Sequence, residues 1–372
     1  MHTRKLLTYK GSAYFRQRIL MATLSGRPVR FESIRSDDDN PGLRDFEVSF
    51  LRLIEKVTNG SVIDISYTGK CRLFIISLAG CTAVLYRPGT ISGGKIKHEC
   101  PTSRAIGYYL EPLIGLAPFA KNPIVATFTG ITSNNTDISV DTIRTVTLAN
   151  FKHFGLDTDV ELKITKRGSS PLGGGEVRFI CPTVRLVKPI QVVDQGRIKR
   201  IRGISFSTRV SPQTANRMVE SARGVLNPLI PDIYIYTDVY KGADAGLSPG
   251  YGITLVAEST TGALMSAELM GEAGDSPEDI GQKCAKQLLS EVEKGGCFDS
   301  MHQWIAFLFM VLSTEDVSKT RIGRLSSFSM QFLRDLQDFF NVTFKIKPDT
   351  DTNTILMSCV GVGYVNTNKK MA

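Results

Sequence analysis

Residues 167–177 read Arg167-Gly168-Ser169-Ser170-Pro171-Leu172-Gly173-Gly174-Gly175-Glu176-Val177, between two stretches that have the pattern of β-strands. Three consecutive glycines permit positive φ and allow another group to approach the backbone closely. No Gly-Lys-Ser/Thr follows them, so the loop is not a P-loop. Residue chemistry alone leaves two interpretations open, a flexible hairpin and a loop shaped for a close contact.

The elements around this loop follow a recurring order. The first part of the chain predicts a short strand, a helix, a strand, a helix and two strands, at residues 7–10, 16–24, 29–34, 46–57, 62–65 and 84–86. A comparable order follows at residues 106–116, 124–128, 140–154, 160–166 and 176–181. Near the C-terminus the pattern predicts helices at 277–292, 303–312 and 330–340 and strands at 342–347 and 354–362. Three such units, spaced by roughly 80–100 residues, indicate an internal repeat.

The segment from about Arg185 to Glu272 interrupts this order. It contains a basic stretch, a helix at 211–226 and strands at 233–237 and 253–257. This pattern predicts a small inserted α+β domain. The expected division is residues 1–185 for the first two units, 186–290 for the inserted domain and 291–372 for the third unit.

The composition is that of a globular protein with an anionic partner. Of the 372 residues, 42% are hydrophobic and 22% are charged, and the formal net charge is +9. No apolar run is long enough to cross a membrane, and the N-terminal residues do not resemble a signal peptide. Seven scattered cysteines without a CxxC pair predict neither a disulfide framework nor a metal site. The positive charge favours contact with nucleic acid.

Several blocks of this sequence resemble one protein family. The stretch Arg167-Gly168-x-x-Pro171-x-Gly173-Gly174-Gly175-x-Val177 is similar to the signature of the RNA 3′-terminal phosphate cyclase family. Further blocks match in the same order, namely Ile34-Arg35 with Pro41-Gly42-Leu43, Ser248 to Gly252, and Gly295 to Asp299. The resemblance covers nearly the whole chain. It implies an α+β fold in which three βαβαββ units form a large domain and a smaller α/β domain is inserted before the third unit.

The resemblance also implies that cyclase chemistry has been lost. The enzymes use a histidine nucleophile in a His-Leu-x-Thr-Asn block, which falls here on Phe328-Ser329-Met330-Gln331-Phe332. A phenyl ring has no lone pair with which to attack a phosphate. No other histidine can take the place of Phe328, since the only four are His2, His98, His153 and His302.

Other family positions of the nucleotide pocket differ as well. The glycine-rich N-terminal block is replaced by Ala13 to Gln17, an expected arginine by Asp38, an expected Gln-His pair by Phe46-Glu47, and an expected Asp-Gln pair by residues near Trp304-Ile305. We therefore expect no cyclase activity, no cofactor, no metal and no small-molecule substrate.

Three further blocks are similar to the eukaryotic cyclase-like branch of the family: Asp39 to Asp45, Arg209 to Pro212 and Pro231 to Asp238. This resemblance implies a role in early pre-rRNA processing and small-subunit assembly. It also implies nuclear and nucleolar localisation, and as partners a ribosome-assembly GTPase, the pre-rRNA and the small-subunit processome.

The basic stretch within the inserted segment is a candidate site for RNA or partner binding. Its cations alternate with Ile198 and Ile201, so that several can share one exposed face: Arg197, Lys199, Arg200 and Arg202. They fit phosphate groups or an acidic patch on the GTPase. The alternative is a solvated edge strand that uses charge to prevent aggregation.

Arg334 and Asp335 are candidates for a different activity. Both are expected to point away from the apolar face of their helix, which holds Phe332, Leu336 and Phe339. An arginine beside a carboxylate can stabilise a phosphate and position a nucleophile, as an endoribonuclease requires. The alternative is an ordinary solvated pair on a helix surface.

The segment from Lys70 to Cys81 lengthens a connection that the family makes as a tight turn. Gly69-Lys70-Cys71 can be encoded by a 5′ splice consensus, and Ala79-Gly80 can supply the closing AG. A retained intron and a genuine longer hairpin, with Leu73 to Ile76 packed on the sheet, are both open.

We expect that deletion of Lys70 to Cys81 is tolerated or stabilising, because the flanking strands can pair without it and a shorter loop loses less chain entropy. Sequencing of transcripts across this junction tests the retained intron, which predicts a dominant transcript without the segment. A transcript that always contains the segment, with a deletion costing about 2–5 kcal/mol, would instead establish a packed hairpin.

Overall fold

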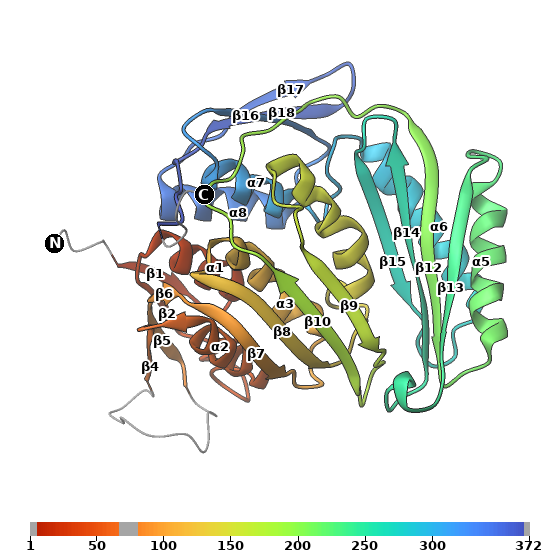
Figure 1. Ribbon diagram of the computed structural model, residues 1–372, viewed down its shortest axis with the longest axis horizontal. Helices are drawn as coiled ribbons and strands as arrows, with labels where there is room; N and C mark the ends of the chain where they lie inside the picture. Colours follow the sequence, from red (N-terminus) through yellow and green to blue (C-terminus); the bar gives the residue numbers. More distant parts are fainter. Residues whose placement is uncertain (1–5, 67–80, 368–372) are drawn as a thin grey trace.

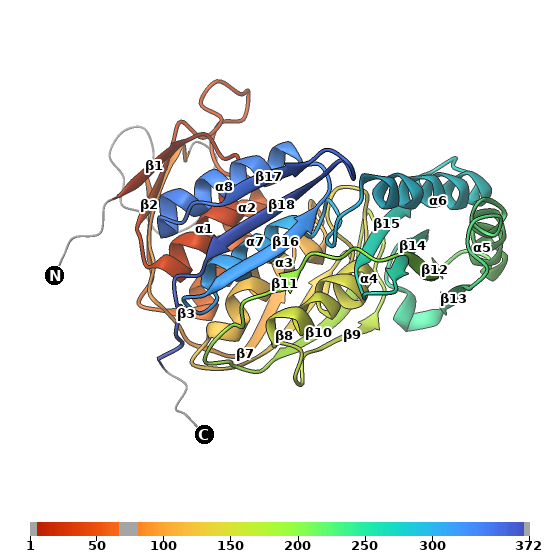
Figure 2. The same cartoon turned by 90° about the horizontal axis from the view of Figure 1, so that it is seen from above.

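The computed structural model describes residues 6–66 and 81–367. Its elements form an α+β fold, which confirms the predicted class. Among the described residues, the buried hydrophobic side chains form a large core that draws on residues from Phe15 to Cys359, a smaller one between Ile201 and Leu288, and a small cluster of Val146, Val256 and Leu264. Figures 1 and 2 show three sheets gathered around helices on one side of the molecule and a fourth sheet with its own helices on the other.

The first sheet has the strand order β1-β2-β5-β4, with β1 parallel to β2 and the other pairs antiparallel. Its strands are β1 (Leu7–Lys10), β2 (Val29–Glu32), β5 (Ala83–Arg87) and β4 (Val62–Ser66). Helix α1 (Phe15–Ser25) lies between β1 and β2 in the chain, and helix α2 (Asp45–Val57) lies between β2 and β4. A short ribbon of β3 (Thr58–Asn59) and β6 (Thr90–Ile91) lies beside this sheet.

The second sheet has the order β7-β8-β10-β9, again with one parallel pair, β7 with β8. Its strands are β7 (Gly93–Glu99), β8 (Asn122–Gly130), β10 (Gly175–Cys181) and β9 (Glu161–Lys166). Helix α3 (Ile106–Leu116) follows β7 and continues into η1 (Ala117–Phe119). After β8 come three short helical segments, α4 (Val140–Thr142), η2 (Ile143–Thr147) and η3 (Ala149–Phe154).

The third sheet has the order β11-β16-β18-β17, with β11 parallel to β16. Its strands are β11 (Gln191–Val192), β16 (Val317–Ile322), β18 (Thr354–Val360) and β17 (Lys345–Asp349), with helices α7 (Gln303–Leu312) and α8 (Ser327–Phe340). Gln191–Val192, which the sequence places in the inserted segment, thus pairs with a C-terminal strand. We call these three sheets and their helices the large domain.

The fourth sheet has the order β13-β12-β14-β15 and two helices on one face. Its elements are β12 (Ile198–Thr208), α5 (Pro212–Leu226), β13 (Ile233–Tyr240), β14 (Gly250–Ser259), β15 (Leu264–Met270) and α6 (Pro277–Lys294), with the short η4 (Gly242–Ala245). We call this unit the small domain. Ile233 and Ile235 turn toward the helices and join its core.

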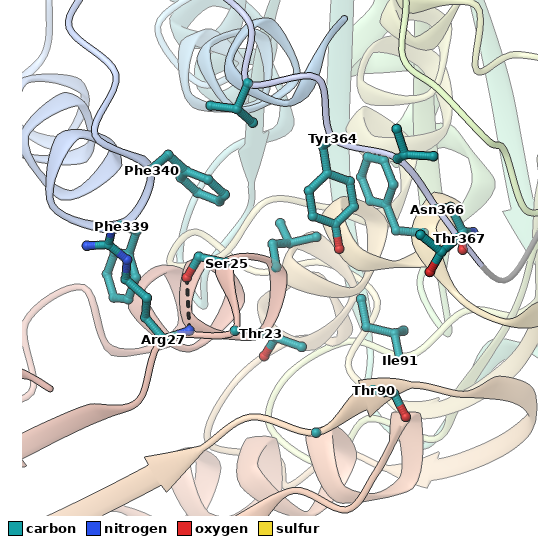
Figure 3. Close-up of a pocket in the computed structure, with 16 residues that line it drawn as sticks. Thr23, Ser25, Arg27, Thr90, Ile91, Phe339, Phe340, Tyr364, Asn366 and Thr367 are labelled. Carbon is teal, nitrogen blue, oxygen red and sulfur yellow. Dashed lines mark hydrogen bonds between the residues drawn. The ribbon is translucent and has the colours of Figure 1, made fainter. Parts of the chain in front are cut away.

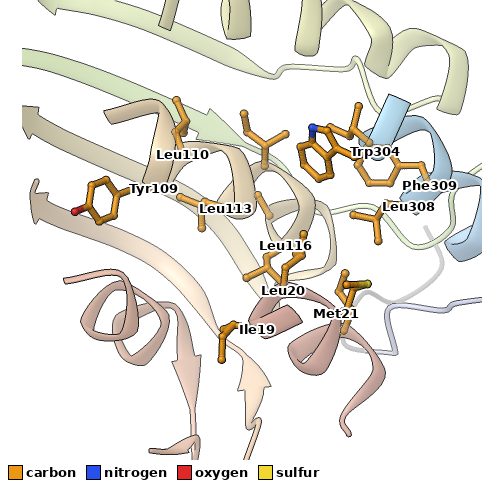
Figure 4. Close-up of a cluster of buried hydrophobic side chains, with 14 of the residues drawn as sticks. Ile19, Leu20, Met21, Tyr109, Leu110, Leu113, Leu116, Trp304, Leu308 and Phe309 are labelled. Carbon is orange, nitrogen blue, oxygen red and sulfur yellow. The ribbon is translucent and has the colours of Figure 1, made fainter. Parts of the chain in front are cut away.

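The central helices of the large domain pack closely because of one glycine. Figure 4 shows Leu20 of α1, Leu116 of α3 and Leu308 of α7 meeting in the large core. A Cβ atom on Gly115 would lie 3.1 Å from Leu20 and 3.2 Å from Leu308. Since each fully buried leucine contributes about 1.5–3 kcal/mol, close approach here stabilises all three helices together.

The predicted elements agree with the structure in the helices more often than in the strands. No strand was predicted at β7, β15 or β16, although all three are present. Of the segment Lys70 to Cys81, residues 70–80 lie outside the described residues. Cys81 itself is fully buried, so a deletion that spares it avoids removing a packed side chain. The six described cysteines are buried and free.

Candidate functional site

Phe328, where the family resemblance places the lost nucleophile, lies in the first turn of α8. The Ser326 hydroxyl accepts a hydrogen bond from the Ser329 amide and so begins the helix. The half-buried Phe328 ring stacks on Phe332 at 6.1 Å between centroids and lies 5.7 Å from Tyr14. Tyr14 belongs to the N-terminal block that departs from the enzymes. Two of the substituted blocks therefore meet, and they meet as an aromatic cluster.

Arginines around this cluster are matched with carboxylates. Arg16 pairs with Glu111 at 2.7 Å, and its guanidinium lies 4.6 Å over the ring of Tyr108. Arg35 makes two contacts with Glu47, at 2.7 and 2.8 Å, and its hydrogen bonds to that carboxylate raise the pKa of Arg35.

Arg104 follows the same arrangement from the opposite side of Tyr108. Its guanidinium lies 4.5 Å from the ring centroid, and its Nε donates to Asp137 at 2.9 Å. The Phe46 ring, from the substituted Gln-His pair, packs edge-on against Tyr108 at 5.3 Å. Because each guanidinium is already neutralised, a nucleotide phosphate entering here would have to displace a carboxylate.

The expectation that Asp335 faces solvent is wrong. Its side chain is fully buried and forms a double hydrogen bond with Arg18 of α1, at 3.0 and 3.2 Å. The spacing contains the reason, since Asp335 lies three residues after Phe332 and four before Phe339, and therefore on the buried stripe. The prediction placed only apolar residues in the core, whereas Asp335 is a carboxylate that is buried together with its ionic partner Arg18.

Arg334 does point outward, as expected. Its described hydrogen bond is a long one of 3.5 Å to Gln331 on the same helix. The structure therefore separates the two candidates, because Arg334 is exposed on one side of α8 and Asp335 is held by Arg18 on the other. They do not form one solvent-facing pair.

The glycine-rich stretch begins with Arg167, and the contacts of its side chain show why an arginine is present there. Its side chain is 0% exposed and pairs with Asp141 at 2.6 Å and with Asp238 of the small domain at 2.8 Å. The guanidinium also lies 4.5 Å over the Phe206 ring. Burial alone would raise the pKa of the Asp141 carboxyl, but Arg167 lowers it below its usual value. This ion network joins the two domains.

The glycines after Arg167 allow a second contact between the domains. The Leu247 amide donates to the Gly173 carbonyl at 2.9 Å, and the Leu172 amide donates to the Ser248 hydroxyl at 3.0 Å. Gly174 has φ +81°, and a Cβ there would lie 2.8 Å from Leu247. A Cβ on Gly168 would lie 2.2 Å from the Gly175 amide nitrogen, and one on Gly175 would lie 2.6 Å from the Gly168 amide nitrogen. The loop that also contains Pro171 thus joins β9 and β10 as a hairpin and is packed against the small domain, which agrees with a loop shaped for a close contact.

Two further buried networks connect the domains along β15. Glu268 accepts hydrogen bonds from the Ser139 amide at 2.9 Å and the Thr142 hydroxyl at 2.5 Å, and burial raises the pKa of its carboxyl. Asp299 accepts from the Ser266 amide at 3.0 Å and from the His302 amide at 2.9 Å. His302 is fully buried, which makes it a structural residue rather than a nucleophile.

The basic stretch covers the start of β12, where Ile198 to Arg200 pair with β14 alone, and β12 is a central strand only from Ile201 onward. There it is hydrogen-bonded between β13 and β14. Three of its cations are ion-paired, Lys199 and Arg200 with Glu258 at 2.8 and 2.6 Å, and Arg202 with Asp232 at 2.8 Å. Arg197 is exposed just before the strand begins. The four residues thus lie together at one end of β12 and remain partly open to solvent.

A further cavity lies elsewhere, in the large domain. It has a volume of about 550 Å³ and lies between the end of α1, the end of α8 and the C-terminal segment (Figure 3). Phe340 and Tyr364 project toward it, and the Arg27 amide donates to the Ser25 hydroxyl at its wall. Phe328 is at the opposite end of α8. This cavity is therefore not a remnant of the nucleophile site.

We expect that Arg167→Met lowers the free energy of unfolding by about 3–5 kcal/mol, because it leaves Asp141 buried without its cation. Chemical denaturation measures the change. Arg144→Met is the matched control: Arg144 also contacts Asp141, at 3.2 Å, but is more exposed, so its removal should cost about 1 kcal/mol or less. Equal losses in the two variants would contradict the structural role of Arg167.

Asp335→Ala should likewise destabilise the protein by about 3–5 kcal/mol, since it leaves the buried Arg18 guanidinium unpaired. Arg334→Ala, one residue away but exposed, should shift stability by about 0.5 kcal/mol or less. Thermal denaturation of the two single variants separates these expectations. Similar stability for both would mean that the Arg18–Asp335 pair contributes nothing.

Comparison with known proteins agrees with this geometry. A sequence model of the family described as RNA 3′-terminal phosphate cyclase matches residues 7–346. The chain is 50% identical to the "rRNA processing protein rcl1" of Schizosaccharomyces pombe, over 100% of both chains. It is 49% identical to the human "RNA 3′-terminal phosphate cyclase-like protein" over 98% of both. It is 42% identical to the "rRNA processing protein RCL1" of Saccharomyces cerevisiae, over 99% of this chain and 98% of that one. The chain therefore belongs to the RNA 3′-terminal phosphate cyclase family and, within it, to the cyclase-like proteins.

Proposed function

We propose that this protein acts in early pre-rRNA processing and in assembly of the small ribosomal subunit. The observation that carries the proposal is the 50% identity, over the full length of both chains, to a protein named for rRNA processing. The proposed site of action is the nucleolus, within the nucleus.

The protein performs this role without cyclase chemistry. Phe328 supports this point, because a phenyl ring stacked on Phe332 has no atom that could form a covalent adenylate. The paired arginines support it independently. Arg16 and Arg35 each hold a carboxylate at 2.7 Å, so the charge that would bind a nucleotide phosphate is already satisfied within the fold.

The proposed mode of action is that of an interaction module. Its partners are a ribosome-assembly GTPase, the pre-rRNA and the small-subunit processome. The formal net charge of +9 supports contact with such anionic assemblies, because lysine and arginine side chains release counterions when they bind phosphates. The clustered cations of β12 are the candidate contact.

The geometry of Arg334 and Asp335 weighs against an endoribonuclease at this position. A general base must reach the proton that it removes, and Asp335 is buried behind a double hydrogen bond to Arg18. Gln331 donates a third hydrogen bond to the same carboxylate, at 2.9 Å. All of the described contacts of Asp335 are thus explained by helix packing.

We also propose the family fold for this chain, with three repeated units and an inserted small domain. The three sheets of the large domain share one strand order and one parallel pair each, which supports descent from a single βαβαββ unit. The small domain lies between β11 and α7, within the third unit. Its separate core supports the proposal that it is an insertion.

We expect that this chain restores pre-rRNA cleavage in fission yeast depleted of its own rRNA processing relative, and that the Phe328→His variant restores it equally. Neither protein should form a covalent adenylate with labelled ATP, because the variant regains a nucleophile but not free cations for the phosphates. Northern analysis of precursors and gel autoradiography give the two readouts. An adenylate on the unmodified chain, or failure to rescue despite normal protein levels, would overturn the proposal.

A further inference from the structure

Two tyrosines stand exposed side by side on the edge strand of the small domain. Tyr234 and Tyr236 of β13 are 60% and 55% exposed, whereas Ile233 before them and Ile235 between them are buried. Because side chains alternate along a strand, both tyrosines lie on the sheet face opposite to α5 and α6. Figure 1 shows β13 as the outer strand of this sheet.

The neighbouring strand continues this face with residues that line a cavity. Tyr234 is in register with Arg202 of β12, and Tyr236 with Ile204. Arg202 and Ile204 line a cavity of about 220 Å³, whose opposite wall is Thr145 of the large domain. The tyrosines do not line this cavity themselves, but they lie on the edge strand directly beside two residues that do, Arg202 and Ile204.

The rest of the same sheet face is already covered. Val256 of β14 and Leu264 of β15 pack against Val146 of η2. At the other end of this sheet face, the guanidinium of Arg167 lies over the ring of Phe206. Asp238, which pairs with Arg167, is the next residue of β13 on the same face after Tyr234 and Tyr236. The large domain therefore closes all but one corner of the face, and the tyrosines occupy the corner that stays open. Residues that serve only the packing between domains would not need to be here.

The charge near this corner is positive. Three cations of β12, Lys199, Arg200 and Arg202, pair with two carboxylates, Glu258 and Asp232, so three positive and two negative charges leave a net +1. The side chains of Arg202 and Asp232 are 37% and 53% exposed. An ion pair so open to water is weak, about 0–1 kcal/mol, so that a phosphate can take the place of the carboxylate.

We propose that this open corner, formed by Tyr234, Tyr236, Arg202 and Ile204, binds single-stranded RNA. Unpaired bases stack on the tyrosine rings while the cations of β12 hold the phosphates. Successive outward side chains on a strand are about 6.6 Å apart, which lets each ring take a separate base of an extended strand. The proposal rests on the proposed function in pre-rRNA processing and adds the part of the protein that touches RNA. A protein partner is favoured less, because isolated rings beside cations lack the contiguous apolar core of a protein interface.

The test measures binding of a fluorescently labelled oligouridine to the full-length protein by anisotropy. Replacing both rings, in Tyr234→Ala with Tyr236→Ala, should weaken binding about tenfold or more per ring, because each stacked base is lost. Tyr234→Phe with Tyr236→Phe should bind like the unmodified protein, since stacking needs the ring and not the hydroxyl. Duplex RNA of the same length should bind more weakly, as its bases are already stacked.

Leu229→Ala serves as the matched control for lost apolar surface, because Leu229 of the small domain is 59% exposed and is not on this face. It should leave binding unchanged. If the double alanine variant binds oligouridine normally but loses association with pre-ribosomal proteins, the corner is a protein-binding site and the RNA proposal is overturned. If the unmodified protein does not bind oligouridine, the proposal is also overturned, while rescue of pre-rRNA cleavage would leave the proposed function intact.

Discussion

One buried guanidinium determines how the two domains meet. Arg167 is enclosed between Asp141 of the large domain and Asp238 of the small domain, at 2.6 and 2.8 Å. Charges so deeply buried are tolerated only in such close, fully hydrogen-bonded pairs, so the network accepts one relative placement of the domains. The glycines after Arg167 follow from this placement, because Leu247 and the backbone of Gly246 lie where a Cβ on Gly174 would project. The open corner at Tyr234 and Tyr236 is what the same placement leaves uncovered.

The position that the family resemblance assigns to the catalytic histidine is filled by aromatic packing. Phe328 and Tyr14 lie where the resemblance places groups that react with or hold a nucleotide, and they contact each other. Arg16, Arg35 and Arg104 each have a carboxylate partner within hydrogen-bonding distance. A site built this way stabilises the large domain and has no unmatched charge to offer a small anion. The paired cations of β12, in the small domain, are more open to water, and Asp232, the partner of Arg202, is itself exposed.

The sequence predicted the helices well and several strands poorly, for a physical reason. In the sequences of the helices, apolar residues recur at helical spacing and form one buried stripe, as Phe332, Leu336 and Phe339 do in α8. Strand β16 has Ser318 and Thr320 at its buried positions, where hydrophobic alternation would require apolar residues. Strand β7 is nearly all polar, with Ile96 and His98 as its inward side chains. Such strands are recognised by the sheets they complete and not by their own composition.

By itself, the sequence determined the family, the α+β class and the absence of a histidine at position 328, because these depend on the identity and order of residues. Tertiary structure alone decided which charges are available. Asp335 and Arg334 are adjacent in the chain, yet one is buried against Arg18 and the other is exposed. Arg167 reads as part of a loop signature until Asp141 and Asp238 are seen around it. Ionic partners that are far apart in sequence come together only through packing, so no local pattern could predict them.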